Sequence, residues 1–150
     1  MQPNQYPYSK PQSIFYTALL LVLVSAPLTN IIEFPEFDDG AIWFVLAYEL
    51  CVLPLLIYIV IKALIPALKG EIALEINSTG IISHMKNITI NWDNIQDMDL
   101  IGVKAQVLNI KFKWEEGGRK AIRIPLQLVK GNDDEIFNTA WAYFEKTDNY

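Results

Sequence analysis

The chain has 150 residues, a formal net charge of −5 and 52% hydrophobic residues. Residues 71–150 carry nine basic and twelve acidic side chains, and this net charge of −3 excludes the strongly basic surface of a nucleic-acid-binding protein. The single cysteine, Cys51, excludes an intramolecular disulfide and a Cys-x-x-Cys pair of metal ligands.

The first 13 residues show no hydrophobic periodicity and are rich in Gln, Pro, Tyr and Asn. Such a composition is typical of an unpaired chain end. The sequence therefore predicts a flexible tail over residues 1–13, in which Lys10 is the only charge.

Two long apolar runs predict a pair of transmembrane helices, a membrane α-hairpin over residues 14–69. Ile14–Ile32 has 19 residues without a charge, and Ala41–Ile61 has 21 residues with Glu49 as the only charge. At about 1.5 Å per residue, each helix reaches across the roughly 30 Å hydrocarbon core of a bilayer. A cleaved signal peptide is the alternative for the first run, but Pro27 would hinder cleavage and a second apolar run follows directly.

The charges that flank the apolar runs predict an orientation. The connection Glu33–Gly40 has four acidic residues and no basic one, whereas Lys10, Lys62 and Lys69 lie at the opposite ends of the two runs. Basic residues favour the cytoplasmic side of a membrane. We therefore expect a multi-pass protein whose termini are both cytoplasmic.

Glu49 is the one ionisable residue at membrane depth. A charge there costs about 2.5 kcal/mol or more, so we expect the side chain to be protonated, partnered or facing a polar gap. One interpretation is a functional intramembrane contact or ion path. The other is a hydrogen bond to Tyr or Ser on the first helix.

After Gly70, apolar and polar residues alternate, which predicts a meander of short antiparallel strands. The expected strands are Ile72–Ile76, Ile81–Lys86, Ile88–Trp92, Ile95–Val103, Leu108–Trp114 and Arg119–Leu126. Ser78-Thr79-Gly80 predicts a turn with Gly80 at positive φ. A three-residue turn, Glu116-Gly117-Gly118, would place Ile110 opposite Ile124 and keep the apolar residues of both strands on one face.

The C-terminal residues predict an amphipathic helix that covers one open end of the sheet. Asn132 or Asp133 can cap it. Its apolar stripe would consist of Ile136, Phe137, Ala140, Trp141 and Phe144. The predicted fold class is thus a membrane α-hairpin followed by one small α+β domain over residues 71–150.

Specific residues of this domain are similar to those of a known family. The segments Ala73-Leu74-Glu75-Ile76, Gly80-Ile81 and Ile90-Asn91-Trp92-Asp93-Asn94-Ile95-Gln96-Asp97-Met98 resemble the strand, Gly-Ile, strand, I-x-W-x-x-I signature of bacterial pleckstrin-homology-like (PH-like) domains. Small bacterial membrane proteins with two hydrophobic helices directly before such a domain look similar over nearly the whole chain.

This resemblance implies an antiparallel β meander or barrel capped by a C-terminal helix, in a protein of the bacterial inner (cytoplasmic) membrane. It also implies a binding or scaffolding role without chemistry. Some small two-helix membrane proteins of this kind serve as immunity proteins against interbacterial toxins.

The residue types needed for catalysis do not assemble into a recognisable pattern. His84 is the only histidine, and no Ser or Cys near it forms a nucleophile motif. The acidic groups at 93–99 and 133–135 lack the ligand spacing of a calcium loop, and Gly117-Gly118 precedes no helix that could bind phosphate. We therefore expect no enzymatic activity, no cofactor and no metal site.

One basic cluster remains as a candidate contact surface. In the register above, Lys111 faces Arg123 across two strands, with Lys113, Arg119 and Lys120 nearby. The candidate contact residues are Lys111, Lys113, Lys120 and Arg123. Directly opposed like charges are unfavourable unless an anion lies between them, such as a lipid headgroup or an acidic protein surface. The alternative is a solvated sheet face balanced by neighbouring glutamates.

Three functional hypotheses follow. The first is a non-enzymatic membrane protein whose cytoplasmic PH-like domain binds a partner protein, with an immunity protein and its toxin as one form. The second is a membrane-tethered adaptor that senses anionic lipid headgroups through the basic cluster. The third is a small transport or membrane-enzyme component that uses Glu49. The expected partners are membrane lipids and a protein, and not nucleic acid; the oligomeric state is left open.

Overall fold

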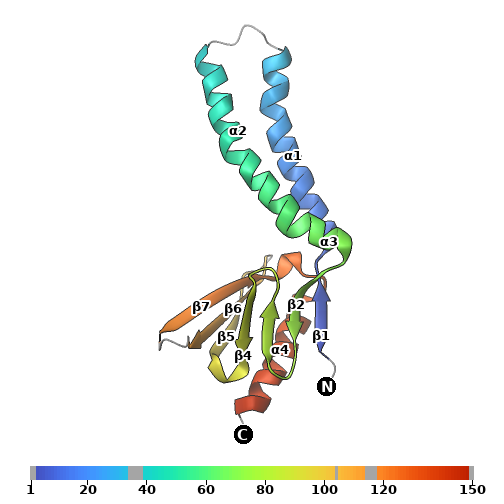
Figure 1. The fold of residues 1–150 in the computed structure, drawn as a ribbon, viewed down its shortest axis with the longest axis vertical. Coiled ribbons are helices and arrows are strands. Elements are labelled where there is room, and N and C mark those ends of the chain that lie inside the picture. The colour runs from blue at the N-terminus through green and yellow to red at the C-terminus, as the bar shows by residue number, and fades with distance from the viewer. Residues whose placement is uncertain (1–2, 34–38, 104, 114–117, 149–150) are drawn as a thin grey trace. The chain divides into compact units, whose positions relative to one another are not determined.

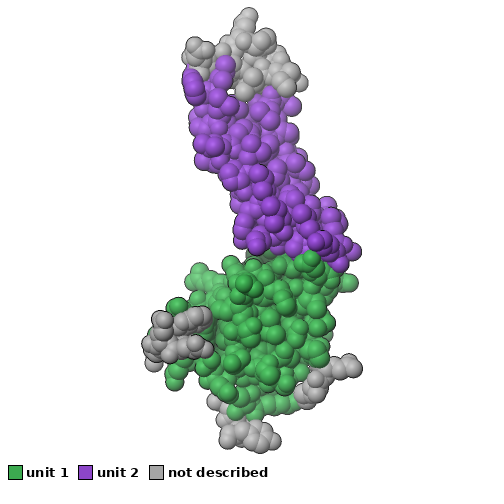
Figure 2. Space-filling model, in the orientation of Figure 1, with its two compact units in different colours: residues 1–9, 70–150 green, residues 10–69 purple. Residues whose placement is uncertain are grey.

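The computed structural model describes residues 3–33, 39–103, 105–113 and 118–148 (Figure 1). The centre of the predicted acidic connection, the predicted strand end at Trp114 and most of the turn at 116–118 lie outside the described residues. The chain forms two compact units, a helical one, Lys10–Lys69, and a discontinuous one that joins Met1–Ser9 to Gly70–Tyr150 (Figure 2).

The helical unit contains two long antiparallel helices. They are α1 (Lys10–Glu33) and α2 (Asp39–Ile59), and α2 continues through the π-helix η1 (Val60–Leu64) into α3 (Ile65–Lys69). Two stretches, Lys10–Thr29 and Ile42–Lys69, are long and apolar enough to cross a membrane, with mean hydropathies of 1.6 and 2.5. Only 17% and 11% of their most apolar windows are buried, whereas the core helix of a soluble protein would be mostly buried.

The short π-helix ends at Leu64, two residues before Pro66. Because proline has no backbone N–H, it cannot complete the usual ladder of i to i−4 hydrogen bonds. Here the N–H of Ile65 donates to the carbonyl of Val60, five residues back, so the ladder changes pattern just before Pro66. Pro27 and Pro54 lie inside α1 and α2.

The second unit contains two antiparallel sheets and a helix. The first sheet has the order β1 (Asn4–Pro7), β2 (Ile72–Ile76), β3 (Gly80–Ser83) and β4 (Ile88–Asn91). After the 3-10 turn η2 (Trp92–Asn94), the second sheet has the order β5 (Ile95–Ile101), β6 (Val107–Lys113) and β7 (Arg119–Pro125). The 3-10 turn η3 (Leu126–Leu128) and α4 (Asp133–Asp148) complete the chain (Figure 1).

Residues 4–7 correct the predicted tail. They form β1, which pairs with β2 through Asn4↔Ile76, Gln5↔Glu75 and Tyr6↔Leu74. The chain end is held further by Tyr8, which is buried and forms an isolated bridge with Val129. Lys10 already begins α1. Composition did not indicate this strand because its stability comes from backbone pairing with residues almost 70 positions away.

The turn between β2 and β3 is built by Asn77. Its side-chain Oδ1 accepts hydrogen bonds from the Thr79 N–H at 2.9 Å and from the Gly80 N–H at 3.1 Å. The expectation of positive φ at Gly80 is wrong, since this residue is the first of β3 and has no positive φ. Glycine is required there because a Cβ would lie 2.1 Å from the Ile90 carbonyl oxygen of β4.

The predicted strands otherwise occur, with ends that differ from the prediction by up to three residues. β3 stops at Ser83, because the chain turns at residues 84–87, where Asn87 adopts a φ of 52°. The alternation from Ile72 onward correctly predicted most of the buried side chains, but Ala73 and Asn109, which it placed on the polar face, are buried as well. The largest fully buried side chains of this unit are Leu74, Ile76, Ile81, Ser83, Met98, Leu108, Ile110, Ile124, Leu126 and Ile136.

α4 has the predicted cap and apolar stripe. Asn132 is the capping residue, and its Oδ1 accepts from the Asp134 N–H at 2.9 Å. Ile136 and Ala140 are fully buried, while Phe137, Trp141 and Phe144 are half-buried and pack against one another. Tyr143 stacks on Trp92 with ring centroids 5.9 Å apart, so α4 also covers η2.

Candidate functional site

The register of β6 and β7 determines which basic residues meet. The predicted pairing of Ile110 with Ile124 is wrong, because Ile110 lies opposite Ile122 and Leu108 opposite Ile124. The shift is two residues, so the apolar residues still share one face. Lys111 therefore lies opposite Ala121, and Arg123 lies opposite Asn109.

Lys111 has acidic partners on β5. Its Nζ donates to Asp97 Oδ2 at 2.6 Å and to Asp99 Oδ2 at 3.3 Å. Hydrogen bonding to Lys111 lowers the pKa of Asp97 below its ordinary value of 3.8, and the bonds to Asp97 and Asp99 raise the pKa of Lys111 above 10.5. The charge of Lys111 is thus compensated within the sheet instead of opposing another cation.

A shallow depression of about 480 Å³ brings two of the predicted residues together. Its lining includes Lys111 and Lys120, with Asp97, Gln96 and Ala121. Lys113 and Arg123 are exposed and do not line it. The structure consequently adds two aspartates to the predicted cations and gives a surface of mixed charge, which we call the β5–β7 face: Asp97, Asp99, Lys111, Lys113 and Arg123.

The sequence prediction missed the role of Asp97 and Asp99 on this face. The signal was present, because residues 97 and 99 alternate with apolar Met98 and Leu100 and must point to one side of their strand. Their distance from Lys111 depended on the pairing of β5 with β6, in which Asp97 lies opposite Lys111 and Asp99 opposite Asn109.

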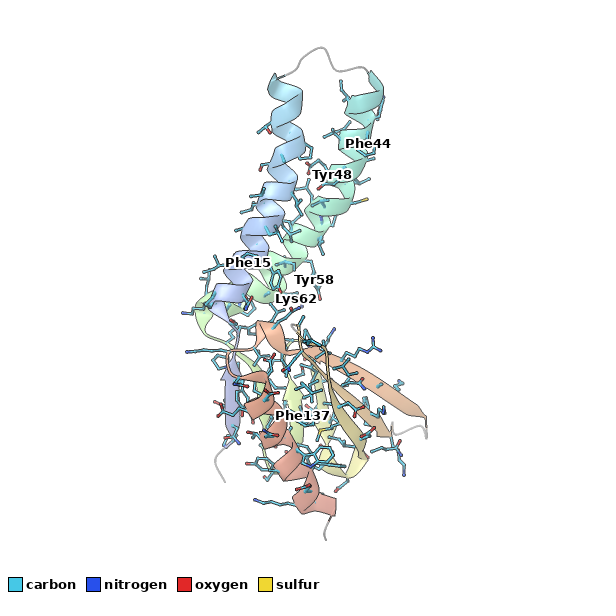
Figure 3. All side chains as sticks on the ribbon, turned by 180° about the vertical axis from the view of Figure 1, so that it is seen from behind. Phe15, Phe44, Tyr48, Tyr58, Lys62 and Phe137 are labelled. Atoms are coloured by element: carbon cyan, nitrogen blue, oxygen red, sulfur yellow. The ribbon has the colours of Figure 1, made fainter. Side chains whose placement is uncertain are left out.

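Glu49 is the second predicted site, and it lies on the buried side of α2. Only 6% of the residue is exposed, and neither carboxyl oxygen has a hydrogen-bond partner among the described residues. The neighbouring Tyr48 lies between the two helices (Figure 3), and its hydroxyl donates to the Leu23 carbonyl of α1 at 3.4 Å instead. The predicted hydrogen bond from Tyr or Ser on α1 to Glu49 is therefore not present.

A buried carboxyl without a partner is costly, since an unsatisfied polar group loses its hydration and gains nothing in return. Ser13, at the start of α1, also has a buried side-chain oxygen without a partner among the described residues. Its neighbour Thr17 donates to the Ser13 backbone carbonyl at 2.8 Å. Glu49 is the only acidic residue among the buried side chains that the structure describes.

No group of three His, Cys, Asp or Glu side chains in the described part of the chain is arranged to hold a metal ion. His84 is exposed in the turn after β3, and Cys51 is exposed on α2. Comparison of the chain with protein-family models, with curated proteins and with solved structures finds no match.

Proposed function

We propose that this protein is a membrane-anchored, non-enzymatic binding module whose soluble domain recognises a protein partner. The observation that carries the proposal is the ammonium group of Lys111, which is hydrogen-bonded to two carboxylates. A surface on which aspartates lie among the cations suits the polar contacts of a protein interface. An anionic lipid surface would instead be attracted by a set of uncompensated cations.

The two long apolar helices support membrane insertion, because most of their surface is exposed and apolar. Trp43 and Phe44 on α2 are 72% and 74% exposed, a poor arrangement in water and a good one in lipid. The acidic connection and the lysines at the other ends favour cytoplasmic termini in a bacterial inner membrane. The meander of strands closed by α4 supports a PH-like domain.

The test is co-purification of the tagged, full-length chain from detergent-solubilised membranes of its own cell, followed by mass spectrometry. We expect one protein to be retained in a defined ratio and to be lost when Lys111→Glu and Arg123→Glu are combined. Lys86→Glu is the matched control, because Lys86 is exposed in the turn between β3 and β4. Absence of any stoichiometric protein would overturn the proposal.

A lipid assay separates this proposal from a lipid adaptor. A soluble version, in which a Gly-Ser linker replaces residues 10–69, is incubated with vesicles of phosphatidylcholine alone or mixed with phosphatidylglycerol. We expect equal, weak binding to both. Strong binding to the anionic vesicles that disappears in the double charge reversal would favour the adaptor.

Immunity against an interbacterial toxin is one specific form of partner binding. If it holds, expression of the full-length chain rescues cells that produce the retained partner. Growth arrest despite normal abundance of the chain would exclude immunity while leaving partner binding intact.

A further inference from the structure

β7 is the one long and regular free edge among the sheets of the described residues. β1 and β4 have four residues each, and β1 has a register shift between Tyr6 and Pro7. β5 has a shift between Ile95 and Asp97. β7 pairs with β6 over seven consecutive residues without a shift and has no further strand beside it (Figure 1). Natural proteins protect sheet edges by short length, by bulges, by charged side chains and by proline. β7 is neither short nor bulged, and its basic residues and Pro125 restrict which segments can pair with it.

The alternation of hydrogen bonds shows which backbone groups point to the free edge. Leu126 N–H donates to the Gln106 carbonyl, so this pair is of the hydrogen-bonded type. Bonded pairs recur at every second residue in an antiparallel ladder, which places residues 120, 122 and 124 of β7 toward β6. The backbone groups of Arg119, Ala121 and Arg123 then point outward.

Pro125 agrees with this assignment. It is two residues beyond Arg123, so its nitrogen also points to the free edge, where a proline removes no hydrogen bond to β6. The edge available to a fourth strand therefore runs from residue 119 to residue 123 and ends at the proline. This length suits an extended segment of about five residues.

The charge of β7 indicates the chemistry of that segment. The strand RKAIRIP has three basic residues and no acidic one. Ala121 and Arg123 are exposed, so residues of an added strand would lie beside them. Opposite charges on neighbouring strands stabilise their pairing, and like charges destabilise it.

We propose that β7 is the docking edge for an extended, acidic segment of the partner protein, which adds to the sheet as a fourth strand through backbone hydrogen bonds. This inference rests on the proposed function and specifies it. Backbone pairing supplies affinity, and the exposed Arg123 selects segments rich in Asp and Glu.

The test uses the full-length chain and the co-purification described above. Ala121→Pro removes an outward N–H without removing a bond to β6, whereas Ala121→Val keeps that N–H and serves as the control at the same position. We expect Ala121→Pro and Arg123→Glu each to reduce partner retention about tenfold, and Ala121→Val to leave it unchanged. Circular dichroism and thermal unfolding check each variant, and Arg123→Glu decides the matter if Ala121→Pro fails to fold.

Photo-crosslinking identifies the docked segment. With Ala121→p-benzoylphenylalanine we expect adducts to one partner peptide that has two or more acidic residues, and none with the same group at Lys86. Adducts to lipid, to residues 119–125 of a second copy or to a segment without acidic residues would overturn the inference. Equal retention of the partner by Ala121→Pro and Ala121→Val would also overturn the inference. In that case the partner is still bound, and the proposed function stands.

Discussion

Lys111 illustrates how one residue changes the interpretation of a surface. Considered in the sequence alone, it belongs to a group of cations at 111, 113, 120 and 123. In the folded domain its ammonium group lies 2.6 Å from Asp97 Oδ2 and 3.3 Å from Asp99 Oδ2. The local charge is then set by the cross-strand neighbours.

The Asp97–Lys111 pair predicts a specific pH dependence. Because the pKa of Asp97 is lowered from 3.8, the pair stabilises the fold above that pH and its contribution disappears as the pH falls through the lowered value. Because the pKa of Lys111 is raised from 10.5, its contribution is present below 10.5 and disappears as the pH rises through the raised value. NMR titration should find the pKa of Asp97 below 3.8 and find it higher in Lys111→Gln. An unchanged pKa in that variant would contradict the pairing.

A side chain at position 80 would clash with the neighbouring strand. An added Cβ would lie 2.1 Å from the Ile90 carbonyl oxygen, so Gly80→Ala forces β3 and β4 apart. We expect the free energy of unfolding to fall by about 1–3 kcal/mol in urea denaturation. Gly118→Ala is the control, because no atom lies within 4 Å of the corresponding Cβ position and the residue has no positive φ. Equal effects of the two substitutions would refute the explanation.

We expect an apolar substitution of Glu49 to raise the thermal stability of the protein. Its two carboxyl oxygens are buried without partners among the described residues, so Glu49→Leu removes a desolvation cost and places an apolar side chain at this buried position of α2. We expect a higher Tm for the detergent-solubilised chain, and a smaller change for Glu49→Gln. A lower Tm in Glu49→Leu would mean that the carboxyl has a partner in the membrane. Loss of function in Glu49→Gln at normal abundance would instead favour the intramembrane role.

At the scale of elements, β1 is part of the domain although 60 residues of the helical unit separate it from β2. Its pairing covers the edge of β2, and the adjoining Ser9 N–H donates to the Leu128 carbonyl at 2.8 Å. The predicted domain over residues 71–150 is therefore incomplete.

The pairing of β1 with β2 should determine the stability and the oligomeric state of soluble fragments. A fragment of residues 70–150 loses the pairs of Tyr6 with Leu74 and of Gln5 with Glu75, which exposes the edge of β2. A version in which a Gly-Ser linker joins residues 1–9 to 70–150 retains them. We expect the linked version to unfold at a higher urea concentration and to remain monomeric in size-exclusion chromatography. Equal midpoints and equal elution would show that β1 contributes nothing.

At the scale of the whole molecule, the helical unit is an insertion between two paired strands. β1 ends at Pro7 and α1 begins at Lys10, while α3 ends at Lys69 and β2 begins at Ile72. Both connections are two residues long, so each end of the helical unit continues within a few residues into one of two neighbouring strands. A domain that merely followed a membrane anchor would be joined to it by a single connection.

The sequence alone determined the elements whose signal is local. Continuous apolar runs predicted α1 and α2, alternation predicted β2 to β7, and the cap at Asn132 with the stripe through Ile136 and Ala140 predicted α4. Each pattern repeats with the period of its own element, so neighbouring residues suffice to reveal it.

Only the tertiary structure decided which distant segments pair. β1 has no strong local pattern, the two-residue shift of β6 against β7 preserves the same alternation, and the contact of Gly80 with Ile90 appears only once β3 and β4 lie together. The mixed charge of the β5–β7 face follows from the same pairing. Backbone hydrogen bonds are nearly independent of side-chain type, so the register depends on the packing of the assembled sheet and not on any one segment.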